Sequence, residues 1–134
     1  MKSNRKIALV TGGAKRIGQA ICRLLHESGI DLMIHYRHSA DEAKKLQEDL
    51  NKIRNDSANI IQADLVDTNI LPNLIEKTIK TYGRLDILIN NASSYYPTEI
   101  GKMNEENWND LIGSNLKATS MFSLVNLFHS FSFR

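Results

Sequence analysis

A glycine-rich turn with two basic side chains lies near the start of the sequence. Residues 11–18 read Thr-Gly-Gly-Ala-Lys-Arg-Ile-Gly and follow the apolar run 7–10. Glycine lets the backbone approach a pyrophosphate closely, and the N-terminus of a following helix offers N–H groups and partial positive charge to an anion. Lys15 and Arg16 add two full charges there. The pattern predicts a dinucleotide-binding turn made by Gly12, Lys15, Arg16, Ile17 and Gly18.

The end of the second apolar run, 32–34, carries a different set of polar side chains. At this position an Asp or Glu usually binds the ribose hydroxyls of a cofactor without a 2′-phosphate, and the segment has neither. It offers instead a guanidinium, two imidazoles and a hydroxyl, which suit an added phosphate. A solvated polar loop is the alternative. We expect the cofactor to be NADP(H), bound by His35, Tyr36, Arg37, His38 and Ser39.

Two more strand ends supply candidate ligand groups. Asp64 and Leu65 follow the run 58–63, where a carboxylate and an apolar side chain could flank an adenine. The segment Asn-Asn-Ala-Ser at 90–93 follows the run 85–89. Ligands of open α/β sheets bind beyond the carboxyl ends of the strands, so we expect all four ends to meet at one crevice.

These residues must be positioned by alternating strands and helices. The four apolar runs predict buried strands, and between them apolar residues recur every three or four positions, as in helices. Gly29 is placed to end the first helix, and Ser39 with Glu42 has the spacing of a capping box that opens the second. The order β-α-β-α-β-α-β-α predicts a Rossmann-like α/β fold, a doubly wound parallel sheet covered on both faces.

The last helical stretch opens at 104–107 and contains Asn115. Helical spacing places this amide on the apolar side, where it must find hydrogen-bond partners. It is either a structural clamp between helix and loop or a functional group. The apolar residues of the same stripe are Trp108, Leu111, Ile112, Leu116 and Phe122.

Bulk properties are those of one globular domain. The chain has 134 residues, 42% of them hydrophobic and 24% charged, and a net charge of +2. Scattered basic residues give no reason to expect nucleic acid or a membrane surface as a partner, and no apolar run is long enough for a membrane span. The single Cys22, in a helical pattern, fits a reducing compartment, so we expect a cytoplasmic protein without a metal site.

Taken together, residues 11–18, Asp64-Leu65, Asn90-Asn91-Ala92 and Asn115 resemble the short-chain dehydrogenase/reductase family. Arg16, where most members have a glycine, the segment Ile-His-Tyr-Arg-His-Ser at 34–39 and Asn-Asn-Ala-Ser-Ser-Tyr-Tyr-Pro-Thr at 90–98 narrow the resemblance to pteridine reductases. It covers nearly all of residues 5–125.

The resemblance implies a reductase that passes hydride from NADPH to a pterin or folate. Asn91, Ala92 and Ser93 would line the ribose and nicotinamide side, and Arg16, Ser93 and Tyr95 would meet the substrate, with the Tyr95 ring stacked on the pterin. Family members usually associate through the helix that contains Asn115, so the resemblance also implies a homo-oligomer.

The family's proton donor, a Tyr followed four residues later by a Lys, does not occur in the 134 residues. Of the family's proton relay, only Asn115 is present as a catalytic candidate. We therefore expect the N-terminal, cofactor-binding half of a reductase, with an atypical tail after about residue 128. Two alternatives stay open: a non-catalytic nucleotide-binding fragment, and a reductase of another carbonyl substrate such as an acyl thioester.

Overall fold

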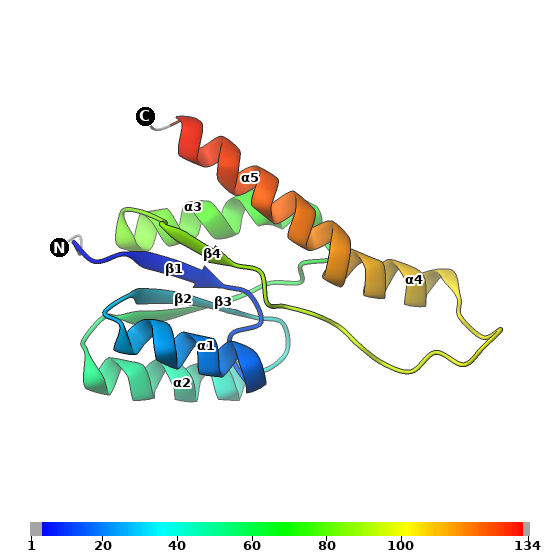
Figure 1. Ribbon diagram of the computed structural model, residues 1–134, viewed down its shortest axis with the longest axis horizontal. Coiled ribbons are helices and arrows are strands. Elements are labelled where there is room, and N and C mark those ends of the chain that lie inside the picture. The colour runs from blue at the N-terminus through cyan, green and yellow to red at the C-terminus, as the bar shows by residue number, and fades with distance from the viewer. Residues whose placement is uncertain (1–3, 133–134) are drawn as a thin grey trace.

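Four parallel strands form the centre of the molecule in a computed structural model (Figure 1). Residues 4–132 are described, the side chains of 128–132 excepted, so the predicted atypical tail lies largely outside the described side chains. In space the strands follow the order β3-β2-β1-β4, and every pairing is parallel. Their bounds are β1 Ile7–Val10, β2 Asp31–Tyr36, β3 Ala58–Gln62 and β4 Ile87–Ile89.

Helices cover both faces of this sheet, as the alternating pattern predicted (Figure 1). Two of them, α1 (Arg16–Glu27) and α2 (Ala40–Ile53), lie on one face. The other face carries α3 (Leu71–Tyr82), which follows a short 3-10 turn, and α5 (Ala118–Ser132). The fold is Rossmann-like α/β, and the expected fold class is confirmed.

Strand β1 shows why the sheet needs two helical layers. All four of its side chains are fully buried, and they alternate between the two faces. Ile7 and Leu9 pack into the cluster that includes α3 and α5, whereas Ala8 and Val10 pack into the cluster that includes α1 and α2. A strand buried on both faces has a continuous apolar sequence, as residues 7–10 do.

The structure agrees with only some of the features expected at three helix boundaries. Gly29 follows α1 with φ of +84°, the left-handed conformation that glycine adopts without steric cost. Helix α2 begins after Ser39 as expected, but the predicted capping box is wrong. Ser39 has ψ of 59° instead of the extended backbone of a capping residue, and its side chain makes no cap hydrogen bond. Asn104 and Asn107 do form a reciprocal capping box at the start of α4 (Glu105–Ile112).

The predicted last helix is interrupted by one π-helical segment. Residues Gly113–Lys117 join α4 to α5 with wider turns. The expected apolar stripe is wrong, because Phe122 is buried while Trp108 and Leu116 are 54% and 61% exposed. A π segment places more residues in each turn, so side chains before and after it no longer share one face at helical spacing.

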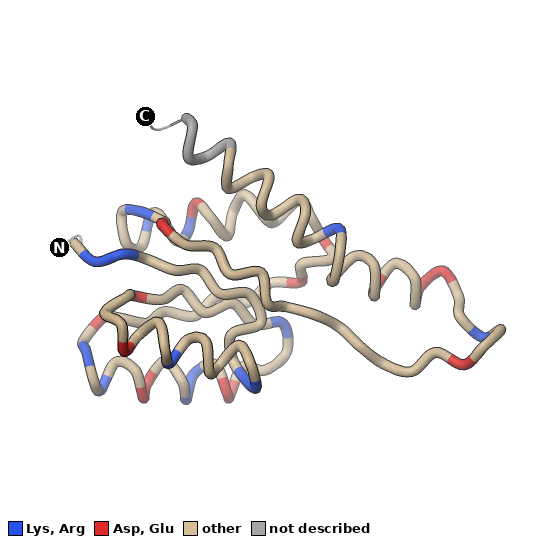
Figure 2. Tube along the Cα trace, viewed as in Figure 1, with Lys and Arg blue, Asp and Glu red and all other residues tan. Residues whose placement is uncertain are grey.

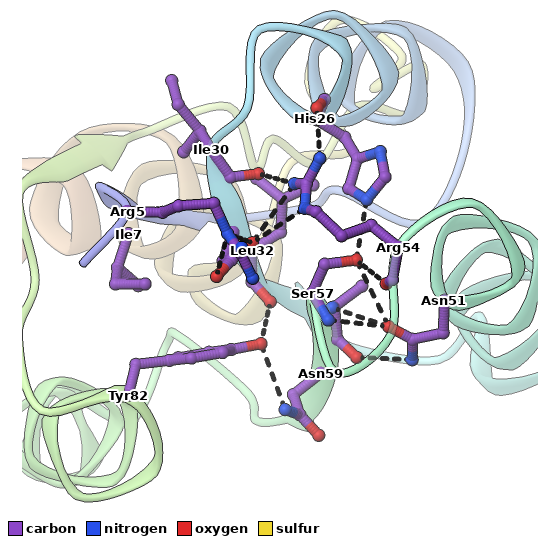
Figure 3. Close-up of polar contacts among 12 residues, drawn as sticks. Arg5, Ile7, His26, Ile30, Leu32, Asn51, Arg54, Ser57, Asn59 and Tyr82 are labelled. Atoms are coloured by element: carbon purple, nitrogen blue, oxygen red, sulfur yellow. Dashed lines mark hydrogen bonds and ion pairs between the residues drawn. The ribbon is translucent and has the colours of Figure 1, made fainter. Parts of the chain in front are cut away.

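A buried network of hydrogen bonds and ion pairs lies at the amino-terminal ends of the strands (Figure 3). The fully buried carboxylate of Asp31 accepts hydrogen bonds from Arg5 Nε at 3.0 Å and Arg54 Nε at 3.2 Å. Arg54 also donates to the His26 carbonyl oxygen, and His26 Nε2 lies 2.7 Å from Ser57 Oγ. Because Ser57 Oγ donates to the Arg54 carbonyl, it accepts from His26 and is not a free nucleophile.

Basic and acidic residues are interspersed along the chain (Figure 2). Residues of both signs recur along α2, which agrees with the small net charge of +2. Among the residues that the structure describes, no helix is both long and apolar enough to cross a lipid bilayer.

Candidate functional site

A cleft of about 440 Å³ lies where the carboxyl ends of the strands meet. Its size is in the range of small-molecule sites. The cleft is lined by all fifteen residues predicted to bind the cofactor, whether from the sequence pattern or from the family resemblance. Segments from four strand ends therefore converge on one crevice. These residues are Gly12, Lys15, Arg16, Ile17, Gly18, His35, Tyr36, Arg37, His38, Ser39, Asp64, Leu65, Asn91, Ala92 and Ser93.

The two outer glycines of the turn are required by close backbone contacts. Gly12 has φ of +61°, and a Cβ atom there would lie 2.9 Å from the Cα of Ala92. A Cβ on Gly18 would overlap the carbonyl oxygen of Gly12 and come within 2.6 Å of Asn91 Nδ2. The start of α1 is therefore pressed against the turn, with its N-terminus directed at the cleft.

Thr11 and Asn91 join this turn to the segment after β4. Thr11 Oγ1 accepts hydrogen bonds from the backbone N–H groups of Asn91 and Ala92, both at 3.0 Å. In return, Asn91 Nδ2 donates to the carbonyl oxygens of Thr11 at 3.2 Å and Gly12 at 3.0 Å. Asn91 thus lines the cleft while its amide holds the turn in shape.

His35 lies beneath the turn and supports it. Its ring is 2% exposed, and its Nδ1 accepts a hydrogen bond from Gly12 N–H at 3.1 Å. That contact makes Nε2 the protonated nitrogen, which donates to the Ala63 carbonyl oxygen at 2.9 Å. Burial lowers the pKa of His35 and keeps the ring neutral. Both ring nitrogens are therefore engaged by the protein itself.

Arg16 occupies a backbone conformation that normally favours glycine. It begins α1 with φ of +54°, in the left-handed region, which costs about 1 kcal/mol or more for a residue with a Cβ. Neither Arg16 nor Lys15 makes an ion pair within the described part of the chain, and both side chains line the cleft. Two cations are thus available to an anion in the turn.

Arg37, predicted to bind a phosphate, is held between two carboxylates. Its Nη2 donates to Asp64 Oδ2 at 3.0 Å, and its Nη1 donates to Asp110 Oδ1 at 3.2 Å. Asp110 belongs to α4 and was not among the predicted site residues. No sequence signal connects it to Arg37, because the two lie 73 positions apart.

Asn115 acts in this structure as a clamp between the π segment and the loop after β4. Its Oδ1 accepts from Ser94 N–H at 3.0 Å, and its Nδ2 donates to the Ser94 carbonyl oxygen at 2.8 Å. The prediction that the amide lies on the apolar side is wrong, since Asn115 is exposed. Of the two roles left open, the structural clamp is the one this geometry displays.

The three predicted substrate residues do not all lie in the cleft. Arg16 and Ser93 line it, but Tyr95 does not, and its side chain is 87% exposed. Three further lining residues were missed, namely Ala14, Ser94 and Ser114. Ser114 stands next to Asn115 in sequence and lies in the π-helical segment.

The fold, with a cleft at the carboxyl ends of its parallel strands, is that of a Rossmann-like α/β protein. A model of the family described as short chain dehydrogenase matches residues 6–130, and the chain belongs to that family of oxidoreductases. Members of this family typically bind NAD(P)(H).

The curated relatives of the chain are named for different activities. The chain is 33% identical to the 3-oxoacyl-[acyl-carrier-protein] reductase FabG of Staphylococcus aureus strain Mu50, over 84% of this chain and 45% of the reductase. It is 38% identical to pteridine reductase 1 of Leishmania tarentolae, over 70% of this chain and 38% of that enzyme. An uncharacterized oxidoreductase of S. aureus strain MW2 is 34% identical, over 85% of this chain and 48% of that protein. The chain thus spans less than half the length of these curated relatives.

Proposed function

We propose that the cleft binds NADP(H) and that the chain is the cofactor-binding part of an NADPH-dependent reductase. The observation that carries the proposal is the meeting of the glycine turn with the Arg37–Ser39 segment in one cleft. The turn and the α1 N-terminus suit a pyrophosphate, with Lys15 and Arg16 beside it. Arg37, His38 and Ser39 suit a 2′-phosphate, and Asp64 with Leu65 suits the adenine.

We further propose a pterin or folate as the substrate of the reductase. Arg16 and Ser93 at the cleft, the Tyr95 that follows them and the similarity to pteridine reductase 1 support this substrate class. The bound cofactor would supply the hydride. Within this chain, the residues that line the cleft would position that cofactor. A flat pterin would stack on an aromatic ring, which is the role we give Tyr95 after movement of its exposed loop.

A reductase of an acyl thioester is the second candidate, supported by the similarity to FabG. A third possibility for this polypeptide is nucleotide binding without catalysis, because the 134 residues contain no Tyr-x-x-x-Lys pair and Asn115 is engaged with the backbone of Ser94. An amide cannot replace a general acid.

Two measurements on the purified chain test these proposals. Titration with NADPH and NADH in wild type and Arg37→Met tests the cofactor, and the preference for NADPH should disappear in the variant. NADPH oxidation with dihydrobiopterin tests the substrate. Turnover above background rules out the non-catalytic alternative, and loss of substrate affinity in Tyr95→Ala separates the pterin from the thioester.

We also propose a homo-oligomer formed through α4 and α5. Several large apolar side chains on these helices are exposed, including Trp108 at 54%, Leu116 at 61% and Leu127 at 55%. Large apolar surface left exposed on these helices supports an interface between copies of the chain.

For the location we propose the cytoplasm, since a single cysteine cannot form an internal disulfide and so suits a reducing compartment. Cys22 is buried, and burial raises its pKa to about 12, which keeps the thiol protonated and unreactive.

A further inference from the structure

Arg37 connects three separate segments at the edge of the cleft. It follows β2, its Nη2 binds Asp64 after β3, and its Nη1 binds Asp110 on α4. The three side chains are 34%, 48% and 25% exposed, so they lie at the surface of the cleft without being freely solvated. One guanidinium between two carboxylates leaves this corner of the cleft with a formal charge of −1.

The two carboxylates are held differently. Asp64 is fixed by a second contact, because its Oδ1 accepts a hydrogen bond from Val66 N–H at 3.1 Å. Within the described part of the chain, the Asp110 carboxylate is bonded to Arg37 alone. Asp110 is therefore the partner that Arg37 can release at the lower cost.

A phosphate at Arg37 must share the guanidinium with these two carboxylates. Arginine binds phosphate best through two parallel N–H groups, and one N–H of each Nη atom of Arg37 is already engaged, which leaves one further N–H on each. The remaining Nε atom is buried without a hydrogen-bond partner among the described residues, so it does not face the cleft as a free donor. A phosphate at Arg37 must therefore displace a carboxylate or share the guanidinium with both of them.

We propose that Asp110 sets the discrimination between dinucleotides with and without a 2′-phosphate by competing with that phosphate for Arg37. The inference rests on the proposed binding of NADP(H). A 2′-phosphate would have to compete with Asp110 for Arg37 Nη1 and would be repelled by the Asp110 carboxylate. A ribose with two free hydroxyls carries no such charge and does not need Nη1. Asp110 thus weakens the binding of NADPH and leaves that of NADH nearly unchanged.

The variant Asp110→Asn removes the negative charge of the side chain but keeps its shape. Its amide oxygen can still accept the hydrogen bond from Arg37 Nη1, whereas the negative charge is gone. A partly exposed ion pair is worth up to about 1 kcal/mol, so the affinity for NADPH should rise about three- to fivefold at low ionic strength. The gain should shrink in about 1 M salt, where the Debye length is only about 3 Å.

The experiment compares dissociation constants for NADPH and NADH in the wild-type chain, Asp110→Asn, Asp110→Ser and Glu106→Gln. Glu106 is exposed and lies one turn before Asp110 on α4, so its variant removes the same charge from the same helix without touching Arg37. Circular dichroism establishes that each variant is folded, and Asp110→Ser replaces Asp110→Asn if the latter is not.

The expected result is a selective gain for NADPH in the Asp110 variants and no change in the NADPH to NADH affinity ratio in Glu106→Gln. An unchanged or lowered ratio in the folded Asp110 variants overturns the inference while the binding of NADPH by the wild type stands. An equal gain in Glu106→Gln also overturns it, because the effect would then be one of net charge. A wild-type chain that binds neither dinucleotide contradicts both the inference and the proposed function.

Discussion

Gly12 N–H donates a hydrogen bond to Nδ1 of the buried His35 ring at 3.1 Å, so the glycine-rich turn is supported by a neutral histidine. The same ring donates to the Ala63 carbonyl oxygen, which links the turn after β1 to the end of β3. Protonation of His35 would put a proton on the nitrogen that accepts from Gly12. The shape of the turn therefore depends on the charge of this residue.

The first prediction concerns pH. Burial lowers the pKa of both His35 and His26 below the ordinary histidine value of about 6.5, so the unfolded chain binds more protons than the folded chain in mildly acidic solution. The contribution of these histidines to stability is complete above about pH 6.5 and is lost as the pH falls toward their lowered folded pKa values. Urea unfolding between pH 5 and 8 should show this slope. In His35→Leu the slope should decrease, and an unchanged slope would remove His35 as its source.

His35→Leu should also lower stability at pH 8. The variant leaves Gly12 N–H and the Ala63 carbonyl without their partner, at a cost of about 1–3 kcal/mol for each buried group that stays unsatisfied. His38→Leu is the control, since His38 lies in the same segment but is exposed, whereas His35 is buried. Equal unfolding free energies for the two variants would contradict the supporting role of His35.

The second prediction compares two glycines. In Gly18→Ala the new methyl group overlaps the Gly12 carbonyl and presses on Asn91, so the turn must shift, and we expect a loss of about 2 kcal/mol or more. Gly29→Ala is the matched control, because Gly29 has φ of +84° but no atom within 4 Å of the added Cβ. Its cost should be the backbone strain alone, about 1 kcal/mol. Thermal melts that rank Gly29→Ala as the more damaging change would refute the close approach at Gly18.

The third prediction separates strain from charge at Arg16. Arg16→Gly removes the steric cost of φ at +54° but increases the freedom of the unfolded chain, so its stability should stay within about 1 kcal/mol of the wild type or rise. Its affinity for NADPH should nevertheless fall several-fold, because a cation of the cleft is lost. Arg16→Lys keeps the charge and should retain most of the affinity. Full affinity in Arg16→Gly would show that the guanidinium does not meet the cofactor.

The fourth prediction concerns the clamp made by Asn115. Asn115→Leu removes both hydrogen bonds to Ser94, and the loop after β4 should then open more often. Limited proteolysis should cut the variant faster within residues 93–103, with little change in the melting temperature. Asn109→Leu, an equally exposed change on α4, is the control. Cutting at the same rate in both variants would argue against the clamp.

Much of the cleft could be predicted because its parts depend on local sequence. Gly12 and Gly18 mark a turn whose backbone leaves no space for a side chain, and β1 has a continuous apolar sequence because both its faces are covered. The strand ends then place Asp64 and Asn91 at the same edge of the sheet. Sequence spacing carries this information directly.

The features of the cleft that the sequence did not predict depend on contacts between distant segments and on one irregular helix. Asp110 reaches Arg37 only through the packing of α4 beside the cleft. Within the π segment, Ser114 lines the cleft and Asn115 is exposed, and a regular helical period does not predict this arrangement. Ser39 shows the limit of a local motif, since its backbone leaves the extended region that side-chain capping needs.

Calorimetric titration of the chain with NADPH and NADH, in wild type and Gly18→Ala, tests the proposed cofactor site most directly. We expect saturable one-to-one binding of NADPH by the wild type, weaker binding of NADH, and loss of both in Gly18→Ala. A wild-type chain that binds neither, or a folded Gly18→Ala that binds NADPH as tightly as the wild type, would contradict the assignment of the cleft.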